Sequence, residues 1–387
     1  MKLGHELAGL TAGLDQLYRS TKSSDGFLDR EGLIPVAMAP VEPILLRDYN
    51  EATERLQNLI NRLPQEAESE LRLAYLSEMA DSLLMLIETF QEKPVSFQER
   101  LKRQLRVDTQ KIGAEIFDGY YSTIREKLDE LGYRSGDLTE DVKRFEKDNR
   151  VAPQAVLATL GELTKEARRR SNAMMYDLDD DWIEPVAAQD VPFSAYCDYP
   201  GRRLILNLDL PYTTYSLKHL ATHEAFPGHL VHMGLRERYV KEGLMPLDGA
   251  QVVTSSASSA LFEGIADNGL FFIDWVDTPA DELAVALQRL RSASRCNAAW
   301  MLHVENKSLE DIAEITAQTA FQEVSTVRSR LSFLKHGLRA PFVYAYWCGE
   351  VAVHDVWKTV EKDRRKEFWD HLYGHMHTPS TLRDFWK

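Results

Sequence analysis

Residues 222–232 read THEAFPGHLVH, so that two histidines, His223 and His229, flank a glutamate, Glu224, within one short stretch. Neutral imidazoles are common zinc ligands, and a catalytic zinc site keeps one coordination position open for water. A carboxylate beside that water can accept its proton when the water attacks a carbonyl group. The stretch therefore predicts half of a zinc site with a built-in general base, and we expect the rest of the chain to form the scaffold and the substrate groove.

The spacing of these histidines differs from the usual H-E-x-x-H helix, in which two histidines four residues apart share one face. On an unbroken helix, His223 and His229 would point about 240° apart around the axis. Proline cannot continue a regular helix and glycine tolerates unusual backbone angles, so the Pro-Gly pair at 227–228 can loop out two residues. We therefore expect His229 to return to the metal, with His232 and His219 as competing ligands.

A second stretch, residues 261–267, reads LFEGIAD and supplies the candidate for a third ligand. Glu263 is the expected ligand, and Gly264 beside it allows a neighbouring backbone or the metal to approach closely. The small residues at 254–260 allow this helix to pack tightly against another helix, as a buried site requires. Asp267 lies one helical turn after Glu263 on the same face, where it is expected to accept a hydrogen bond from a ligating histidine and fix its tautomer.

The motif His-Glu-x-x-Pro-Gly-His at 223–229, followed by Glu-Gly at 263–264, resembles a large family of bacterial proteins of unknown function. That family is regarded as zinc metallopeptidases of the gluzincin type, distantly similar in architecture to the mostly helical carboxypeptidase Taq family. The resemblance covers roughly the second half of the chain, and the first half matches only in being helical. It implies zinc ligation by His223, His229 and Glu263, with Glu224 as the general base.

The same family usually carries Glu-Gly-Trp-Ala-x-Tyr on its downstream helix, whereas residues 263–268 read EGIADN here. The two aromatic positions therefore differ, which affects the expected substrate preference rather than the expected ligand.

A late segment of the chain matches the family in part, through Arg330, Arg339 and the Tyr-x-x-Gly sequence that begins at Tyr346. The resemblance implies that Tyr346 donates a hydrogen bond to the oxyanion formed on attack, with Tyr344 as its rival. It also implies that Arg330 or Arg339 binds a substrate carboxylate in bidentate fashion.

The remaining pattern predicts a mainly α-helical fold with a small β element. Apolar residues between Leu76 and Ile87 recur with the period of one helical stripe. Ser96 and Glu99 form a capping-box pattern that opens a helix expected to run to Leu131. Further helices are expected over 139–149 and 154–172, and after Thr278 and Ser308.

The strands expected from the sequence are residues 193–198 and 202–208, which flank a Pro-Gly turn signal. Leu204, Leu206 and Leu208 alternate with Ile205, Asn207 and Asp209 in the second strand, the period of a strand with one buried face. We expect an antiparallel hairpin whose edge strand lies beside the active site and pairs with an extended peptide, or else a small stabilising hairpin.

The acidic run at 177–181 is expected to be a solvated loop and to mark a seam in the chain. It separates an N-terminal helical region, 1–175, from a catalytic zinc-binding region, 176–387, within one continuous fold. The three histidines at 371–377 are expected to lie on the surface.

Composition excludes several classes of partner. The chain has 387 residues and a formal net charge of −14, which argues against a nucleic-acid partner. Its three cysteines form no C-x-x-C motif, so we expect neither a disulfide framework nor a thiolate metal site. No apolar run is long enough for a signal peptide or a membrane span, so a cytoplasmic location without a membrane partner is expected.

These features together predict a zinc-dependent hydrolase, a metallopeptidase acting on short or unfolded peptides, in which Glu224 activates a zinc-bound water. A metallo-hydrolase of small-molecule amides or esters is the first alternative, using the same site. A non-catalytic metal-binding protein is the second. The expected partner is thus a peptide or small amide substrate, and nothing in the pattern indicates an oligomeric state.

Overall fold

Helices account for most of the computed structural model, which describes residues 1–21, 26–178 and 181–387. The strands are few and short, so the predicted mainly α-helical class with a small β element is confirmed. Within the described residues, no helix is long and apolar enough to cross a membrane.

The chain divides into two compact units, each assembled from separated stretches. Unit 1 contains Met1–Thr109, His232–Gly264 and His336–Lys387, and unit 2 contains Gln110–Val231 and Ile265–Lys335. The seam predicted near residue 176 would divide the chain at a single point, whereas each unit contains separated stretches. The regions 1–175 and 176–387 stay a prediction. Part of the acidic run expected to form that seam, residues 179–180, lies outside the described residues.

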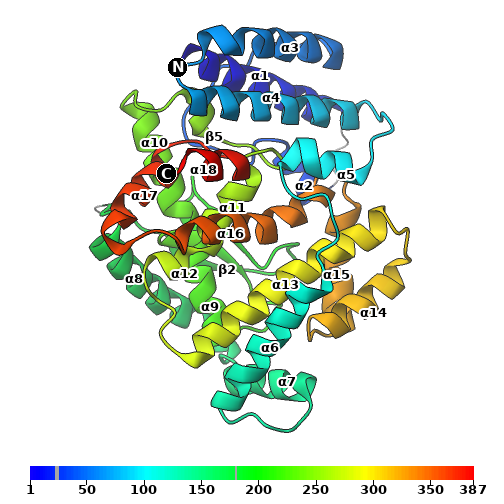
Figure 1. Ribbon diagram of the computed structural model, residues 1–387, viewed down its shortest axis with the longest axis vertical. Helices are drawn as coiled ribbons and strands as arrows, with labels where there is room; N and C mark the ends of the chain where they lie inside the picture. Colours follow the sequence, from blue (N-terminus) through cyan, green and yellow to red (C-terminus); the bar gives the residue numbers. More distant parts are fainter. Residues whose placement is uncertain (22–25, 179–180) are drawn as a thin grey trace. The chain divides into compact units, whose positions relative to one another are not determined.

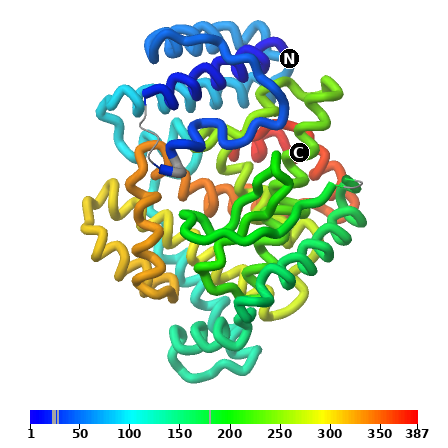
Figure 2. The backbone as a smooth tube through the Cα atoms, turned by 180° about the vertical axis from the view of Figure 1, so that it is seen from behind, coloured from blue at the N-terminus to red at the C-terminus, as the bar shows by residue number. Residues whose placement is uncertain are grey.

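Unit 1 contains a layer of long helices: α1 (Lys2–Thr21), α3 (Tyr49–Glu66) and α4 (Glu70–Phe90) lie side by side in Figures 1 and 2. The apolar stripe predicted in α4 lies in the core beneath this layer, where Leu76 and Leu83 are fully buried. Helices α3 and α4 each begin at a residue whose side chain caps the first turn.

The remaining elements of unit 1 are shorter. They are α2 (Phe27–Glu31), β1 (Val36–Ala37), α5 (Phe97–Glu99), the π-helical turn η1 (Arg100–Leu105), α10 (His229–Lys241), the 3-10 turn η4 (Leu247–Ala250), β5 (Gln251–Val252), α11 (Ser259–Asp267), the 3-10 turn η5 (Ala340–Phe342), α16 (Val343–Trp357), the 3-10 turn η6 (Lys362–Arg364), α17 (Arg365–Gly374) and α18 (Pro379–Phe385). Helices α10 and α11 each have one end in unit 2.

Unit 2 is organised around the long helix α13 (Pro279–His303), which packs against α6 (Ala114–Glu130) and α14 (Leu309–Thr319), as Figure 1 shows. The Thr278 and Ser308 hydroxyls accept the backbone N–H groups three residues on, so the predicted starts of α13 and α14 are confirmed. The other helical elements of unit 2 are α7 (Leu138–Asp148), the 3-10 turn η2 (Pro153–Ala155), α8 (Val156–Met174), α9 (Thr214–Leu220), the π-helical turn η3 (Ala221–Ala225), α12 (Gly269–Phe272) and α15 (Val324–Lys335).

A three-stranded sheet in unit 2 has the order β2-β4-β3 and is visible in green in Figure 2. Strands β3 (Ala195–Asp198) and β4 (Arg203–Asn207) pair antiparallel, with Cys197 opposite Leu204, so the predicted hairpin is confirmed. Strand β2 (Glu184–Ala188) pairs parallel to β4 and was not predicted. Its sequence, EPVAA, lacks alternation and contains a proline, which is tolerated because β2 is an edge strand.

The helix predicted from Ser96 to Leu131 is wrong in its middle, because the chain leaves the helix after η1 and α6 begins only at Ala114. Arg106 has a φ of 58° and ends the first part. The backbone N–H and carbonyl of Ile112 are bound by the Asn297 side chain at 2.8 and 3.1 Å instead of by a helix. Tertiary hydrogen bonds therefore outweigh the local apolar period here.

Candidate metal centre

The histidine motif lies at a widened helical turn in unit 2. Helix α9 begins with a capping box between Thr213 and Ser216 and continues directly into the π-helical turn η3. The Phe226 N–H donates to the Ala221 carbonyl at 3.2 Å, a span one residue longer than in an α-helix. Regular helix resumes only at His229, so the helix is interrupted where the Pro-Gly pair predicts.

Gly228 closes this turn through a close backbone approach. Its N–H donates to the Thr222 carbonyl at 2.9 Å, and a Cβ at this position would collide with the carbonyl oxygens of His223 and Thr222. The φ of Gly228 lies outside the left-handed region. The glycine is therefore required by lack of space rather than by the unusual backbone angles expected from the sequence.

The turn brings together His223, Glu224 and His229. Each offers one ligand atom, and these atoms lie within 4.8 Å of one another. The two imidazole rings have centroids 4.7 Å apart and meet edge to face at 81°. All three side chains are buried, with 6 to 7% of each residue exposed, so a cation there would have little access to bulk water. The donor set of two imidazoles and a neighbouring carboxylate fits zinc.

Asp267 at the end of α11 orients His223. The Nδ1–H group of His223 donates to Asp267 Oδ1 at 2.9 Å, which leaves Nε2 as the lone-pair nitrogen available to a metal. The Gln288 amide donates to the same oxygen at 3.2 Å. Burial by itself raises the pKa of Asp267, but the facing imidazoles of His223 and His219 outweigh it and hold that pKa well below its usual range.

His219, one of the competing ligands, takes part in the contact with Asp267. Its Nε2 lies 3.4 Å from Asp267 Oδ1, and its ring centroid lies 5.4 Å from that of His223. His219, His223 and Asp267 form a second group whose ligand atoms lie within 4.8 Å of one another. His223 therefore belongs to both groups, whereas His229 is grouped with Glu224.

Strand β3 runs beside this centre through Cys197. Burial raises the pKa of the Cys197 thiol well above its ordinary value, and the negative charge of nearby Glu224 raises it further. The thiol therefore stays protonated and is a poor metal ligand. The edge strand expected beside the active site thus lies next to the glutamate of the motif.

Glu263 and Tyr346 lie on two helices of unit 1 that cross at glycines. A Cβ on Gly264 of α11 would collide with the backbone of Gly349 of α16, so the small residues allow the close packing that the sequence predicts. Glu263 is buried beside this crossing, one turn before Asp267 on α11. Tyr346 lies one turn before Gly349, half-buried, with its ring 5.4 Å from that of Phe342.

Two other candidates have aromatic surroundings in unit 1. The ring of His232, the second competing ligand, lies 5.6 Å from Phe262 and 5.5 Å from Tyr373. Tyr344, the rival of Tyr346, is fully buried with its ring 6.0 Å from Phe97.

The two predicted substrate arginines differ sharply. Arg339 is buried in unit 1, where it donates to Thr254 Oγ1 at 2.6 Å and to Glu31 Oε2 at 2.9 Å, contacts that hold the fold together. Arg330 on α15 lies in unit 2, where burial, and then the charges of Arg295 and Arg291 on α13, lower its pKa to about 10.

Several neighbours of the predicted residues were missed by sequence reasoning. Gln288, which binds Asp267, and the arginines beside Arg330 all lie on α13, far from the motif in sequence. The sequence pattern likewise gives no reason to place Cys197 beside the motif. No local pattern marks these contacts, because they arise from the packing of α13 and β3 against other elements.

Two solved structures resemble this fold. One is a protein of Colwellia psychrerythraea described as a "putative lipoprotein", with a TM-score of 0.61 and 14% sequence identity, covering 87% of this chain and 68% of its own. The other is a "putative lipoprotein of unknown function" from Shewanella oneidensis, with a TM-score of 0.55 and 13% identity, covering 87% of this chain and 72% of its own. At these identities the likeness concerns the fold alone. No protein-family model and no curated protein matches the chain.

Proposed function

We propose that this chain is a zinc-dependent hydrolase that acts on peptides. One observation carries the proposal: the turn at 221–228 brings His223, Glu224 and His229 within 4.8 Å of one another, while Asp267 holds the outer nitrogen of His223 at 2.9 Å. Two oriented imidazoles beside a buried carboxylate are the parts that metal-assisted hydrolysis needs.

In the proposed site His223 and His229 hold the zinc ion. Glu263, one turn before Asp267 on the same helix, stays the predicted third ligand. A zinc ion supplies a Lewis acid that polarises the substrate carbonyl and lowers the pKa of a water molecule. The hydrogen bond from His223 to Asp267 fixes the tautomer and the ring orientation, so that little reorganisation is needed on binding.

Glu224 is the proposed general base. It accepts a proton from the attacking water and passes it to the leaving nitrogen of the scissile amide. Its burial limits competing hydration of the carboxylate, and the neighbouring Cys197 thiol is neutral and does not compete for the proton. Tyr346 stays the proposed donor of a hydrogen bond to the oxyanion.

Arg330 and strand β3 favour a peptide substrate over a neutral small molecule. Arg330 faces two further arginines, and within the described part of the chain it forms no ion pair with a carboxylate. A desolvated cation in such surroundings favours an anionic group, such as the C-terminal carboxylate of a peptide. Strand β3 lies at one edge of the sheet, where an extended peptide can pair with its main chain.

Elemental analysis of the purified, zinc-incubated chain tests the metal site. We expect His223→Ala to contain about one zinc per chain less than the wild type. His5→Ala, which removes an exposed histidine outside both histidine groups, should keep the wild-type content. Equal zinc in wild type and His223→Ala would overturn the proposal.

A substrate panel tests the class of reaction. We expect hydrolysis of short peptides, with peptides that have a free C-terminal carboxylate preferred over amidated ones. Arg330→Gln should remove that preference, by about tenfold or more, since a hydrogen bond to a charged group contributes about 1.5–3 kcal/mol. Hydrolysis of only non-peptide amides or esters would instead favour the small-molecule alternative, and zinc binding without any turnover would favour the non-catalytic one.

The predicted cytoplasmic location stays a prediction. Both structural neighbours are described as putative lipoproteins, and that description belongs to them rather than to this chain.

A further inference from the structure

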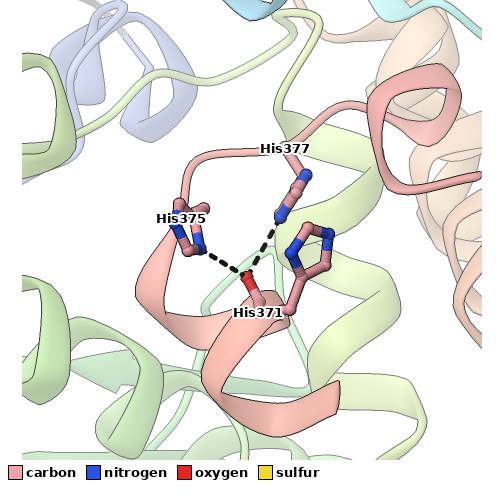
Figure 3. A group of neighbouring side chains, drawn as sticks. All are labelled: His371, His375 and His377. Atoms are coloured by element: carbon pink, nitrogen blue, oxygen red, sulfur yellow. Dashed lines mark hydrogen bonds between the residues drawn. The ribbon is translucent and has the colours of Figure 1, made fainter. Parts of the chain in front are cut away.

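Three histidines converge where α17 ends and α18 begins, in unit 1. Figure 3 shows the rings of His371, His375 and His377 turned toward one another around the end of α17. Each offers one nitrogen, and these nitrogens lie within 4.8 Å of one another. His377 is buried, His371 is half-buried and His375 is exposed, so the group opens to solvent on one side. The prediction that all three lie on the surface is therefore wrong for His377, which packs where α18 begins.

Helix ends hold these rings in place. His371 and His375 are one helical turn apart, and His375 leaves the helix with extended backbone angles of −130° and 160°. His377 then precedes Thr378, whose hydroxyl caps α18 in a reciprocal capping box with Thr381. The end of one helix and the cap of the next thus fix the three positions.

The hydrogen bonds leave ring nitrogens available at this group. His375 Nδ1 and His377 Nε2 both donate to the His371 carbonyl oxygen, at 3.2 and 3.1 Å, as the dashed lines in Figure 3 show. The Nε2 of His375 is therefore the lone-pair nitrogen of that ring. The Nε2 of His371 is buried and has no hydrogen-bond partner within the described part of the chain. A buried ring nitrogen without a partner is costly, and a bound cation would satisfy it.

We propose that His371, His375 and His377 form a second metal site, which binds a divalent transition-metal ion such as zinc. Imidazole nitrogens bind zinc at about 2.0–2.1 Å, so a tetrahedral ion sets its nitrogens about 3.4 Å apart. Coordination through Nε2 therefore requires the exposed ring of His375 to turn, which gives up its hydrogen bond to the His371 carbonyl. Neutral imidazoles suit zinc, copper and nickel, and geometry and availability select among them.

His377 can enter this coordination by a change of tautomer without net proton loss. Its Nε2 proton, which now binds the His371 carbonyl, is replaced by a proton on Nδ1. The Thr381 hydroxyl lies 3.4 Å from Nδ1 and can accept that proton in a hydrogen bond. Nε2 is then the lone-pair nitrogen of the ring, available to an ion that replaces its contact with the His371 carbonyl.

The role of this site differs from the function proposed above and does not depend on it. Within the described residues, no carboxylate is hydrogen-bonded to any of the three rings, and Glu367, one helical turn before His371, acts on that ring through its charge. A metal ion bound there ties the end of α17 to the start of α18 and stabilises this segment of unit 1.

Competition between the full chain and a chromophoric zinc chelator tests the proposal. The metal-stripped wild type, His375→Ala, His377→Gln and the control His5→Ala are each titrated with zinc. We expect His375→Ala and His377→Gln to weaken one binding event by at least about 100-fold, since loss of a mere supporting contact costs about 10–100-fold. His5→Ala should bind as the wild type does.

Wild-type binding in His375→Ala would overturn the second site. His375 is exposed, so this variant should fold, and an unchanged melting temperature without metal verifies that. Wild-type affinity in a folded His377→Gln would show that only the pair His371 and His375 binds, which also overturns the three-ligand site. The event lost in His375→Ala must persist in His223→Ala, so the failure of one site is distinguishable from the failure of the other.

Discussion

The histidine groups of the two units use the same side chain in different surroundings. In unit 2, His223 donates to a buried carboxylate, Asp267, and lies beside a second one, Glu224. In unit 1, the rings of His375 and His377 donate to a backbone carbonyl, and the neighbour of His377 Nδ1 is the hydroxyl of Thr381. The first group combines ligands with a hydrogen-bonded carboxylate, whereas no carboxylate is hydrogen-bonded to the rings of the second within the described residues.

We expect this difference to separate a catalytic site from one that only binds metal. A carboxylate that orients an imidazole raises its basicity as a ligand, and a carboxylate beside the open position moves protons. A carbonyl or hydroxyl neighbour does neither. Imidazole clusters of similar size therefore predict different chemistry, and the residues around the rings decide which.

The largest expected effect comes from removing the proton acceptor of the first group. Glu224→Gln keeps the size of the side chain and loses the base, so kcat should fall by about 10²–10⁴-fold. Zinc content should stay at the wild-type level, which elemental analysis of the same preparation verifies. Retained turnover would remove the distinction between the two groups.

The backbone of the first group should be equally intolerant of change. Gly228→Ala places a Cβ against the carbonyl oxygens of His223 and Thr222, so the free energy of unfolding should fall by about 3 kcal/mol. Gly119→Ala on α6 is the matched control, because a Cβ there meets nothing within 4 Å. That control should be neutral or stabilising by up to about 1 kcal/mol. Urea denaturation measures both, and equal stability of the two variants would contradict the close approach.

Orientation by a carboxylate should have an intermediate effect. Asp267→Asn removes the charge that faces His223 and His219 while preserving the shape, so zinc affinity at the first group should fall by about 10–100-fold. Asp118→Asn changes an exposed acid of the same unit and should leave the affinity unchanged. Chelator competition measures both, and an unchanged affinity in Asp267→Asn would mean that its hydrogen bond does not support metal binding.

The effect that is smallest near neutral pH, where the other three are at full size, is the acid sensitivity of the second group. Burial, and then the charge of His371, lower the pKa of His377 to about 3, whereas an unfolded histidine titrates near 6.5. As the pH falls below about 6.5, the unfolded chain binds a proton that the folded chain does not. Stability should therefore decline toward pH 3 by up to about 1.4 kcal/mol per pH unit from this residue.

Urea denaturation of the metal-free chain at a series of pH values measures this decline. His377→Gln should show a shallower dependence than the wild type, because glutamine does not titrate, whereas His5→Gln should not. Parallel profiles for wild type and His377→Gln would assign the acid sensitivity to other groups.

Much of the helical scaffold could be predicted from the sequence because local signals agree with the structure. The stripe of α4, the caps at Thr278 and Ser308 and the hairpin around Gly201 are all present. The break after Leu105 could not be predicted, since distant side chains such as Asn297 bind the backbone there. Strand β2 pairs directly with β4, although β3 lies between them in the sequence, and the sequence of β2 carries no strand pattern.

The candidate metal centre, too, could be predicted from the sequence only in part. His223, Glu224 and His229 lie close together in sequence, and Asp267 could be anticipated as a partner from its helical spacing to Glu263. The surroundings of Arg330 and the contact of Gln288 depend on how α13 packs, which no local pattern specifies.

The widened turn at Ala221–Ala225 has a consequence for changes in chain length. Each residue of an α-helix advances the chain by about 100° around the axis. Deleting Glu224 or Ala225 shortens this turn, and it would rotate His223 and everything before it relative to the break at Pro227 by about that angle. Insertions and deletions here should therefore be far more damaging than most substitutions, because the number of residues between the two histidines, and not their identity alone, aims both rings at one point.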